Sequence, residues 1–141
     1  MAHLDTGGYA PVLILGDAEW LTVRAVAAGG RVPDDRVARR LRRSGILDDD
    51  GIAPQAAPAL HGAAGATRHL DVARFEGDGS GRRVEAWIGP RRATLVKHEQ
   101  DGFHVYGLDD CEVPSAFAQL LDIGPRYNVD LGPHVLPERV Y

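Results

Sequence analysis

Apolar and polar residues alternate along the middle of the chain, between residues 67 and 109. The segments "TRHLDVARFEG", "RRVEAWIG", "PRRATLVKHEQ" and "FHVYGLDD" each carry a period of two, which is typical of strands that turn one face to a core. The flexible stretch "GDGSG" separates the first two segments, and an Asp-Gly pair, which favours a two-residue hairpin turn, separates the last two. The pattern predicts four consecutive antiparallel strands.

The last two segments allow a register to be predicted. If the Asp-Gly pair at 101–102 is the turn, Gln100 lies opposite Phe103. The residues then divide between two faces, one with Val96, Phe103 and Val105 and the other with Lys97, Glu99, His104 and Tyr106. We expect the first face to meet the core and the second to be solvated, since antiparallel sheets commonly have one wet face.

Helical spacing precedes the strands. A short apolar run at 12–15 predicts a strand or an extended lead-in. Asp17 then offers a side-chain oxygen as N-cap, and a helix is predicted over residues 18–28, ended by the glycines that follow. Its apolar residues recur at i, i+3 and i+7, as Trp20, Val23 and Ala27.

The segment "VPDDRVARRLRRSG" predicts a second helix over residues 34–43. Aspartates stand near its positive end, arginines near its negative end, and Gly45 ends it. Val37 and Leu41 form a narrow apolar stripe. The alanine-rich residues 53–66 contain two prolines and predict either a short helix near 58–64 or a loop.

The segment "EVPSAFAQLLDIGPR" predicts the last helix, with a proline in its first turn and apolar residues at i, i+3 and i+4. We expect it to lie on the apolar face of the sheet. The sequence thus predicts a single α+β domain over residues 1–126, a four-stranded antiparallel sheet with helices packed on one face. Residues 127–141 lack periodicity and are expected to form an extended or disordered tail.

Three aspartates and a glycine in "SGILDDDGIA", residues 44–53, invite comparison with a calcium-binding loop. With Gly51 at loop position 6, position 1 falls on Ile46 and position 12 on Ala57, and neither side chain can bind calcium. Asp48 and Asp50 alone would hold an ion weakly. Aspartate and glycine also suit turn geometry, so the stretch predicts a tight turn and no metal.

Composition limits the function. The chain has 16 Lys plus Arg against 20 Asp plus Glu, a net charge of −4, so nucleic-acid binding would need a local basic patch. Cys111 is the only cysteine, which suits a reducing compartment. The apolar run "PVLIL" is far shorter than a membrane span of about 20 residues. We therefore expect a cytoplasmic protein that does not contact a membrane.

Catalytic motifs are not predicted. The six histidines are scattered without the i, i+4 pair of a helical zinc site. Cys111 precedes a predicted helix, but its acidic neighbours Asp109, Asp110 and Glu112 would raise a thiol pKa, so we interpret it as a structural cysteine rather than a nucleophile. No nucleophile elbow, P-loop or dinucleotide fingerprint stands in a usable context. We expect a protein that is not an enzyme and needs no cofactor.

One cationic stripe lies along the predicted helix over 34–43. Its residues recur at i, i+3, i+4 and i+7, as Arg36, Arg39, Arg40 and Arg43. Three interpretations remain open: a solvated face, a site for an acidic protein partner, or a DNA-binding helix followed by a β-hairpin. The net negative charge and the aspartates at the helix start count against DNA.

Several segments, taken in order, resemble the actinobacterial EspG family. They are "LDDDGIA" after a leucine-bearing helix, "VEAWIGPRRATLV", "DGFHVYGL" and "EVPSAFAQLLDIGPR". Family members show an acidic turn with glycine, a strand with tryptophan, a hairpin with glycine before an aromatic residue, and a helix that ends in Gly-Pro-Arg. The resemblance covers residues 44–126.

The resemblance implies a cytosolic, non-enzymatic chaperone of type VII secretion that binds PE/PPE-like substrates and keeps them soluble. Family members have two similar halves, and this chain is similar to one half. That departure puts the usual substrate in doubt and implies that two copies form a homodimer, with burial of a sheet edge or apolar patch as its physical basis.

A chaperone of this kind would present large side chains on an exposed face. The partner-binding candidates are Trp87, Phe103 and Tyr106, together with the arginine stripe, although each aromatic residue would also suit a core or an ordinary sheet surface. The alternative function is a DNA-binding regulator that uses the arginine helix. A small hydrolase built on Cys111 or a histidine is a third hypothesis.

Overall fold

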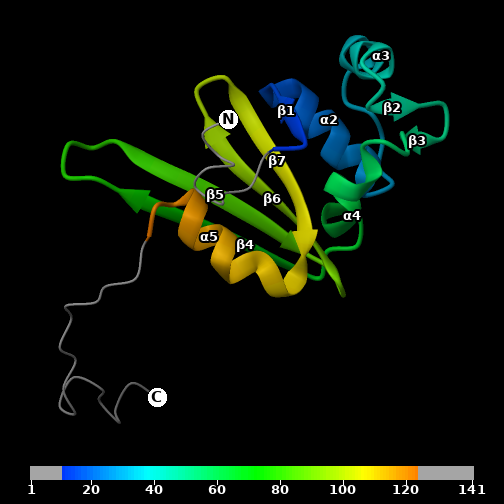
Figure 1. The fold of residues 1–141 in the computed structure, drawn as a ribbon. Helices are drawn as coiled ribbons and strands as arrows, with labels where there is room; N and C mark the ends of the chain where they lie inside the picture. The colour runs from blue at the N-terminus through cyan, green and yellow to red at the C-terminus, as the bar shows by residue number, and fades with distance from the viewer. Residues whose placement is uncertain (1–10, 124–141) are drawn as a thin grey trace, which may run out of the picture.

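The computed structural model describes residues 11–123 of the 141-residue chain, and Figure 1 shows its elements. The strands are β1 (Leu13–Leu15), β2 (Leu47–Asp48), β3 (Gly51–Ile52), β4 (Arg68–Phe75), β5 (Gly81–Ile88), β6 (Arg92–Glu99) and β7 (Gly102–Asp109). The helices are α2 (Asp17–Ala27), α3 (Asp35–Arg43), α4 (Ala57–Ala64) and α5 (Val113–Leu120), with a short 3₁₀ turn, η1 (Asp110–Glu112), before α5. The α+β class is confirmed. The domain boundary predicted at residue 126 and the tail lie outside the described residues.

Five strands form one antiparallel sheet in the order β1-β7-β6-β5-β4. β4 to β7 are the four predicted strands, but the predicted count of four is wrong because β1 joins the sheet beside β7. Leu13 pairs with Val105, and the Val12 N–H donates to the Val105 carbonyl at 2.8 Å. A run of three residues is too short to show a period of two. Its pairing depends on the edge of β7, which lies far along the chain.

The β6–β7 hairpin has a different register from the predicted one. Glu99 pairs with Gly102 and His98 with Phe103, so the turn is Gln100-Asp101. Gly102 belongs to β7, where its φ is +132° and a Cβ would lie 2.4 Å from the Leu15 carbonyl oxygen of β1. The turn therefore lies one residue earlier than predicted, and each residue of β6 pairs with a residue of β7 two positions earlier. A shift of two residues keeps every side chain on the same face, so the predicted division between the two faces is correct.

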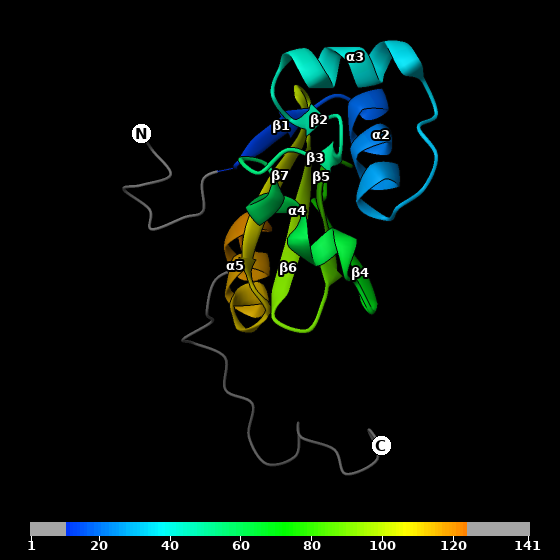
Figure 2. The ribbon, with the colours of Figure 1, turned by 90° about the vertical axis from the view of Figure 1, so that its right-hand side faces the viewer.

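Helices cover both faces of the sheet, whereas one covered face was predicted. Val96 and Val105 are buried beneath α2 and α4, in a core that includes Trp20 and extends to the buried side of α3. On the opposite face Leu95 and Tyr106 are buried in a second core with α5. Figure 2 shows α5 and α2 on opposite sides of the sheet. The expectation that the last helix lies on the Val96 face is therefore wrong, and so is the expectation that the second face is solvated throughout.

Local signals place the helix ends. The N-cap of α2 is Gly16 rather than Asp17, because the Glu19 carboxylate accepts the Gly16 N–H at 2.9 Å and closes the first turn. Asp34 caps α3 by accepting the Arg36 N–H at 2.8 Å. Both predicted helices are confirmed, and the helix interpretation of residues 57–64 is confirmed by α4.

The acidic stretch at 44–53 is a turn, as predicted. It forms a minute hairpin of β2 and β3, in which Leu47 pairs with Ile52 and Asp48 with Gly51. The Asp48 carboxylate accepts the Asp50 N–H at 2.9 Å. Within residues 11–123 no group of three His, Cys, Asp or Glu side chains is placed to hold a metal ion.

α4 lies unusually close to the sheet. A Cβ on Gly62 would lie 2.2 Å from the Thr94 nitrogen of β6, and one on Gly107 of β7 would lie 2.4 Å from the Pro58 carbonyl oxygen. The Thr94 hydroxyl donates to the Ala59 carbonyl at 2.7 Å and accepts the Ala63 N–H at 2.9 Å. Glycines at the contact thus allow a buried hydroxyl to join helix and sheet.

Candidate functional site

The β4 side of the sheet carries the least cover. α4 packs mainly on β6 and β7, and α5 reaches β5 and β6. All residues of β4 are exposed except Arg74, which is half-buried. β5 pairs with β6 only from Val84 onwards, so the β4–β5 hairpin continues as a two-stranded arm that Figure 1 shows projecting beyond its neighbours. We call β4, with the side chains beside it on β5 and α5, the open half of the sheet.

An apolar strip lies on the α5 face of the open half. Leu70 and Val72, successive residues on this face of β4, are 44% and 38% exposed, and Ile123 just after α5 is 45% exposed. Leu70 pairs with Ala86 and Val72 with Val84, both fully buried. The strip is therefore the uncovered margin of the second core.

Arg74 connects the apolar strip to α5. Its guanidinium donates to the Leu121 carbonyl at 3.0 Å and to the Asp122 carbonyl at 2.5 Å, at the negative end of the helix. Asp122 has φ +56°, and the Ile123 N–H donates back to the Ala118 carbonyl at 2.7 Å, which is a left-handed helix end. Hydrogen bonds thus hold the end of α5 against Arg74 of β4 and fix the backbone of Ile123, which follows it.

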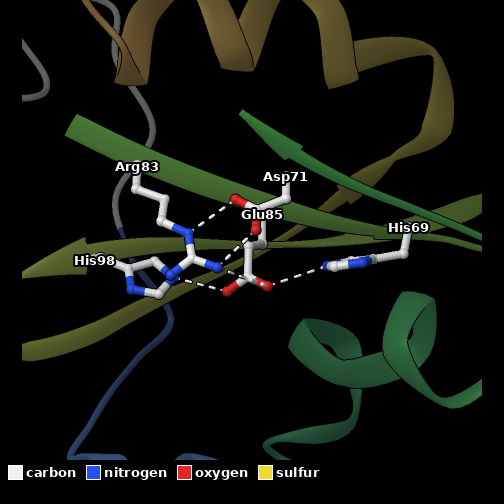
Figure 3. Close-up of polar contacts among 5 residues, drawn as sticks. All are labelled: His69, Asp71, Arg83, Glu85 and His98. Carbon is white, nitrogen blue, oxygen red and sulfur yellow. Dashed lines mark hydrogen bonds and ion pairs between the residues drawn. The ribbon is translucent and has the colours of Figure 1, made fainter. Parts of the chain in front are cut away.

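A polar cluster occupies the other face of the open half, and Figure 3 shows its five residues. Glu85 of β5 lies at its centre with only 8% of its surface exposed. One carboxylate oxygen is 3.1 Å from His69 Nε2 of β4, and the other is 2.7 Å from His98 Nε2 of β6. Arg83 donates two hydrogen bonds to the Asp71 carboxylate, at 2.8 and 2.6 Å.

The charges of the cluster stabilise one another. The hydrogen bonds from Arg83 lower the pKa of the Asp71 carboxyl, and those to Asp71 raise the pKa of the Arg83 guanidinium. Among the described residues, no buried side-chain nitrogen or oxygen lacks a hydrogen-bond partner. Each acidic group of the cluster is thus held by a basic neighbour, an arrangement that fixes side chains in place.

The period of two could have indicated this cluster. Residues 69, 71, 83 and 85 alternate along the "RHLDVARF" and "GRRVEAWI" segments, and a loop with an odd number of residues, such as "GDGSG", makes residues of equal parity face the same side. His98 could not be added from sequence, because it requires the β5–β6 register. Sequence reasoning treated the histidines as scattered and missed the cluster.

The aromatic candidates are partly or fully enclosed. Trp87 is half-buried, with its ring 5.3 Å from Trp20 and the His69 ring 4.5 Å away. Phe103 is half-buried with its ring centroid 6.3 Å from that of Trp20. Tyr106 is 5% exposed beneath α5, where burial, with a smaller contribution from Glu99, raises the pKa of its phenol to about 12. Tyr106 is therefore a core residue and does not belong to an exposed binding face.

The arginine stripe is exposed as predicted. Arg36, Arg39, Arg40 and Arg43 all lie on the outer face of α3, while Val37, Ala38 and Leu41 are buried. α3 packs against α2 and the β2–β3 hairpin rather than against the large sheet. The structure therefore does not bring the arginine stripe together with the open half of the sheet.

Cys111 lies in η1 with its side chain exposed. η1 lies at the surface between β7 and α5, and our interpretation of Cys111 as a structural cysteine rather than a nucleophile stays a prediction. Asp109, Asp110 and Glu112 adjoin it in the chain. As for membranes, none of the helices between residues 11 and 123 has the length and apolar character needed to span one.

Comparison of the chain with protein-family models, with curated proteins and with solved structures yields no match. The resemblance to the EspG family therefore rests on the sequence motifs alone.

Proposed function

We propose that this chain is a non-enzymatic protein-binding module, an EspG-like cytosolic chaperone that holds an apolar segment of a PE/PPE-like type VII secretion substrate. The observation that carries this proposal is the apolar strip of Leu70, Val72 and Ile123. Two of its residues, Leu70 and Val72, lie on a strand rather than on a loop, and Arg74 holds the end of α5 in place.

Apolar side chains on a rigid surface favour binding, because little conformational freedom is lost when the partner arrives. Leu70 and Val72 stand on a strand that pairs with β5 along its whole length. Removing their exposed surface from water would contribute roughly 25 cal/mol for each Å² of apolar area. An apolar client segment is the partner that matches this chemistry.

The polar cluster supports a binding role more than a catalytic one. Both oxygens of Glu85 are engaged by histidines, and Asp71 is engaged by Arg83. A general base must have its proton acceptor available to a substrate. The cluster instead restrains the β4 side chains that border the strip.

The experiment compares client binding by the full chain and two variants of equal size and polarity change. Leu70→Ser removes a residue of the apolar strip, and Ile14→Ser alters a similarly exposed residue on β1, at the opposite edge of the sheet. Each is titrated against a purified PE/PPE-like substrate by calorimetry. We expect Leu70→Ser to weaken binding about tenfold or more and Ile14→Ser to leave it unchanged. Equal affinities for both variants, or no binding by the unaltered chain, would reject the proposal.

A second candidate function, DNA binding, is favoured by the exposure of the arginine stripe on α3. Contacts of arginines to phosphates would make the affinity for duplex DNA fall steeply with salt concentration. Fluorescence anisotropy with labelled duplex at two salt concentrations tests this. Replacement of Arg36, Arg39, Arg40 and Arg43 by glutamine would then abolish the salt dependence of the affinity. An unaltered anisotropy signal would exclude the arginine stripe as the DNA-binding site.

A further inference from the structure

β4 is a long sheet edge that lacks most of the usual protection. It contains no proline and no lysine, and it pairs with β5 residue by residue without a bulge. Short strands, prolines, bulges and charged side chains, lysine above all, are among the means by which proteins keep such edges from pairing. The other edge, β1, has only three residues. Within residues 11–123, β4 is thus the one strand that offers a long unpaired edge.

Three of the four ionisable side chains of β4 turn back towards their own molecule, and the fourth, Arg68, is exposed at the start of the strand. His69 contacts Glu85, and Asp71 is held by Arg83 of the neighbouring strand. Arg74 is held by the carbonyls at the end of α5. These three side chains, whose charges would repel an approaching strand, therefore lie over the faces of their own sheet. The backbone groups of the edge stay accessible.

The free backbone groups of this edge can be assigned. The Glu76 N–H donates to the Ser80 carbonyl at 2.7 Å, and the Arg74 carbonyl oxygen lies 2.9 Å from a Cβ built on Gly81. Even-numbered residues therefore direct their backbone groups to β5. Because the direction alternates along an antiparallel strand, the odd-numbered residues direct theirs outward. They are His69, Asp71, Ala73 and Phe75.

We infer that β4 pairs antiparallel with β4 of a second copy of this chain, about a two-fold axis that passes beside Val72. A two-fold axis perpendicular to the sheet leaves the α5 faces of both copies on the same side of the joined sheet. Such an axis relates each residue of one β4 to its pairing partner on the other, so the residue beside the axis pairs with the same residue of the second copy. The two sheets then join into one continuous sheet. The backbone groups of all four outward-facing residues find partners, as Asp71 with Ala73 and His69 with Phe75 of the second copy.

Charge selects this register among the possible ones. With the axis at Val72, an apolar residue faces itself and Arg68 faces Glu76 of the second copy. With the axis at Asp71, two aspartates would face each other and Arg68 would face Arg74, and like charges directly opposite are destabilising. With the axis at Leu70, only residues 68–72 could pair. The Val72 register is the longest without a like-charge pair.

The same register accounts for the most exposed aromatic side chain of the described chain. Phe75 is 76% exposed at the end of β4, on the face of the polar cluster. In the dimer it would face His69 of the second copy. On the other face the apolar strips of the two copies would become neighbours between their two α5 helices. The dimer therefore joins the two apolar strips, to which we assign client binding, into one larger surface. The dimer can form without a client.

Cysteine cross-linking of the full chain tests the register, with Cys111→Ser as background so that the exposed native thiol does not react. Val72→Cys would place two thiols on a non-hydrogen-bonded pair with Cα atoms about 4.5 Å apart, within disulfide range. Leu70→Cys, similarly exposed on the same face, would place its two Cα atoms about 14 Å apart. With oxidised glutathione we expect a covalent dimer from Val72→Cys and none from Leu70→Cys. A dimer from Leu70→Cys, or none from Val72→Cys, overturns the register.

Sedimentation equilibrium tests the dimer without cross-links. We expect the unaltered chain to have twice the 15.2 kDa mass of one copy. Arg68→Glu and Glu76→Arg should each shift the mass towards the monomer, and the double variant should restore the dimer because both opposed pairs regain opposite charges. A monomeric mass of the unaltered chain at every concentration overturns the inference and leaves the edge available to another protein. A double variant that stays monomeric also overturns it. Client titration of the same samples reports on the proposed function separately.

Discussion

The Arg74 guanidinium donates to the Leu121 carbonyl at 3.0 Å and so joins the edge strand β4 to the end of α5. Arg74→Ala would leave the last carbonyls of the helix to water and release Ile123 from its position. Because Arg74 is only half-buried, we expect a loss of about 1 kcal/mol in the free energy of unfolding. Urea denaturation at fixed protein concentration measures it, and amide exchange at Ile123 should become faster.

Arg82→Ala is the matched control, since Arg82 lies opposite Arg74 on β5 and is exposed. It should change the free energy of unfolding by no more than about 0.5 kcal/mol. An equal loss in both variants would show that Arg74 contributes only general surface charge.

Gly62 is predicted to tolerate no side chain. The Gly62→Ala methyl would lie 2.2 Å from the Thr94 nitrogen and would push α4 away from β6. We expect a loss of about 2–3 kcal/mol or more, as for other overpacked cores, measured by thermal and urea denaturation. Gly77→Ala is the control, because no atom lies within 4 Å of a Cβ at that loop position. Retention of full stability by Gly62→Ala would contradict the observed closeness of helix and sheet.

Glu85→Ala would remove the acceptor shared by His69 and His98. Because His69 is exposed and His98 only half-buried, water can replace the lost acceptor, and we expect a loss of about 1 kcal/mol in the free energy of unfolding. The ring resonances of both histidines should shift in NMR spectra. Asp49→Ala, in the exposed β2–β3 turn, should leave stability and both rings unaltered. If the rings of His69 and His98 kept their resonances in Glu85→Ala, the cluster would not exist in solution.

Tyr106 predicts how stability depends on alkaline pH. Burial raises the pKa of its phenol from near 10 in the unfolded chain to about 12 in the folded one. The folded state therefore retains a proton that the unfolded state loses, so the stability this group contributes is fully present below pH 10 and is lost as the pH rises from about 10 to about 12. A two-unit shift corresponds to a loss of up to about 2–3 kcal/mol.

Tyr106→Phe should remove this component of the alkaline loss and leave stability at pH 7 almost unchanged. Urea denaturation at pH 7, 9 and 11 compares the two proteins. Parallel pH profiles for both would contradict the assigned burial of the phenol.

Much of the local structure follows from the sequence. The period of two in 67–109 correctly predicts four strands, and parity alone correctly separates Val96 and Val105 from Tyr106 on β6 and β7. That separation survives a register error because the true pairing differs by two residues, and side chains alternate with the same period. The arginine stripe on α3 is likewise predicted correctly, since charge and helical spacing are both local.

Assembly required the tertiary structure. β1 joins the sheet through the edge of β7, and α5 covers the face opposite α2, and neither choice is encoded within the segment concerned. A period tells which residues share a face, but which layer covers that face depends on how distant segments pack. Glu85 shows the same limit: its partners His69 and His98 come from two other strands. The sequence by itself therefore determined the elements and their two-sided patterns, because hydrogen bonding and spacing act over a few residues. The tertiary structure alone decided the covered faces, the polar cluster and the free edge, because burial and pairing join residues far apart in the chain.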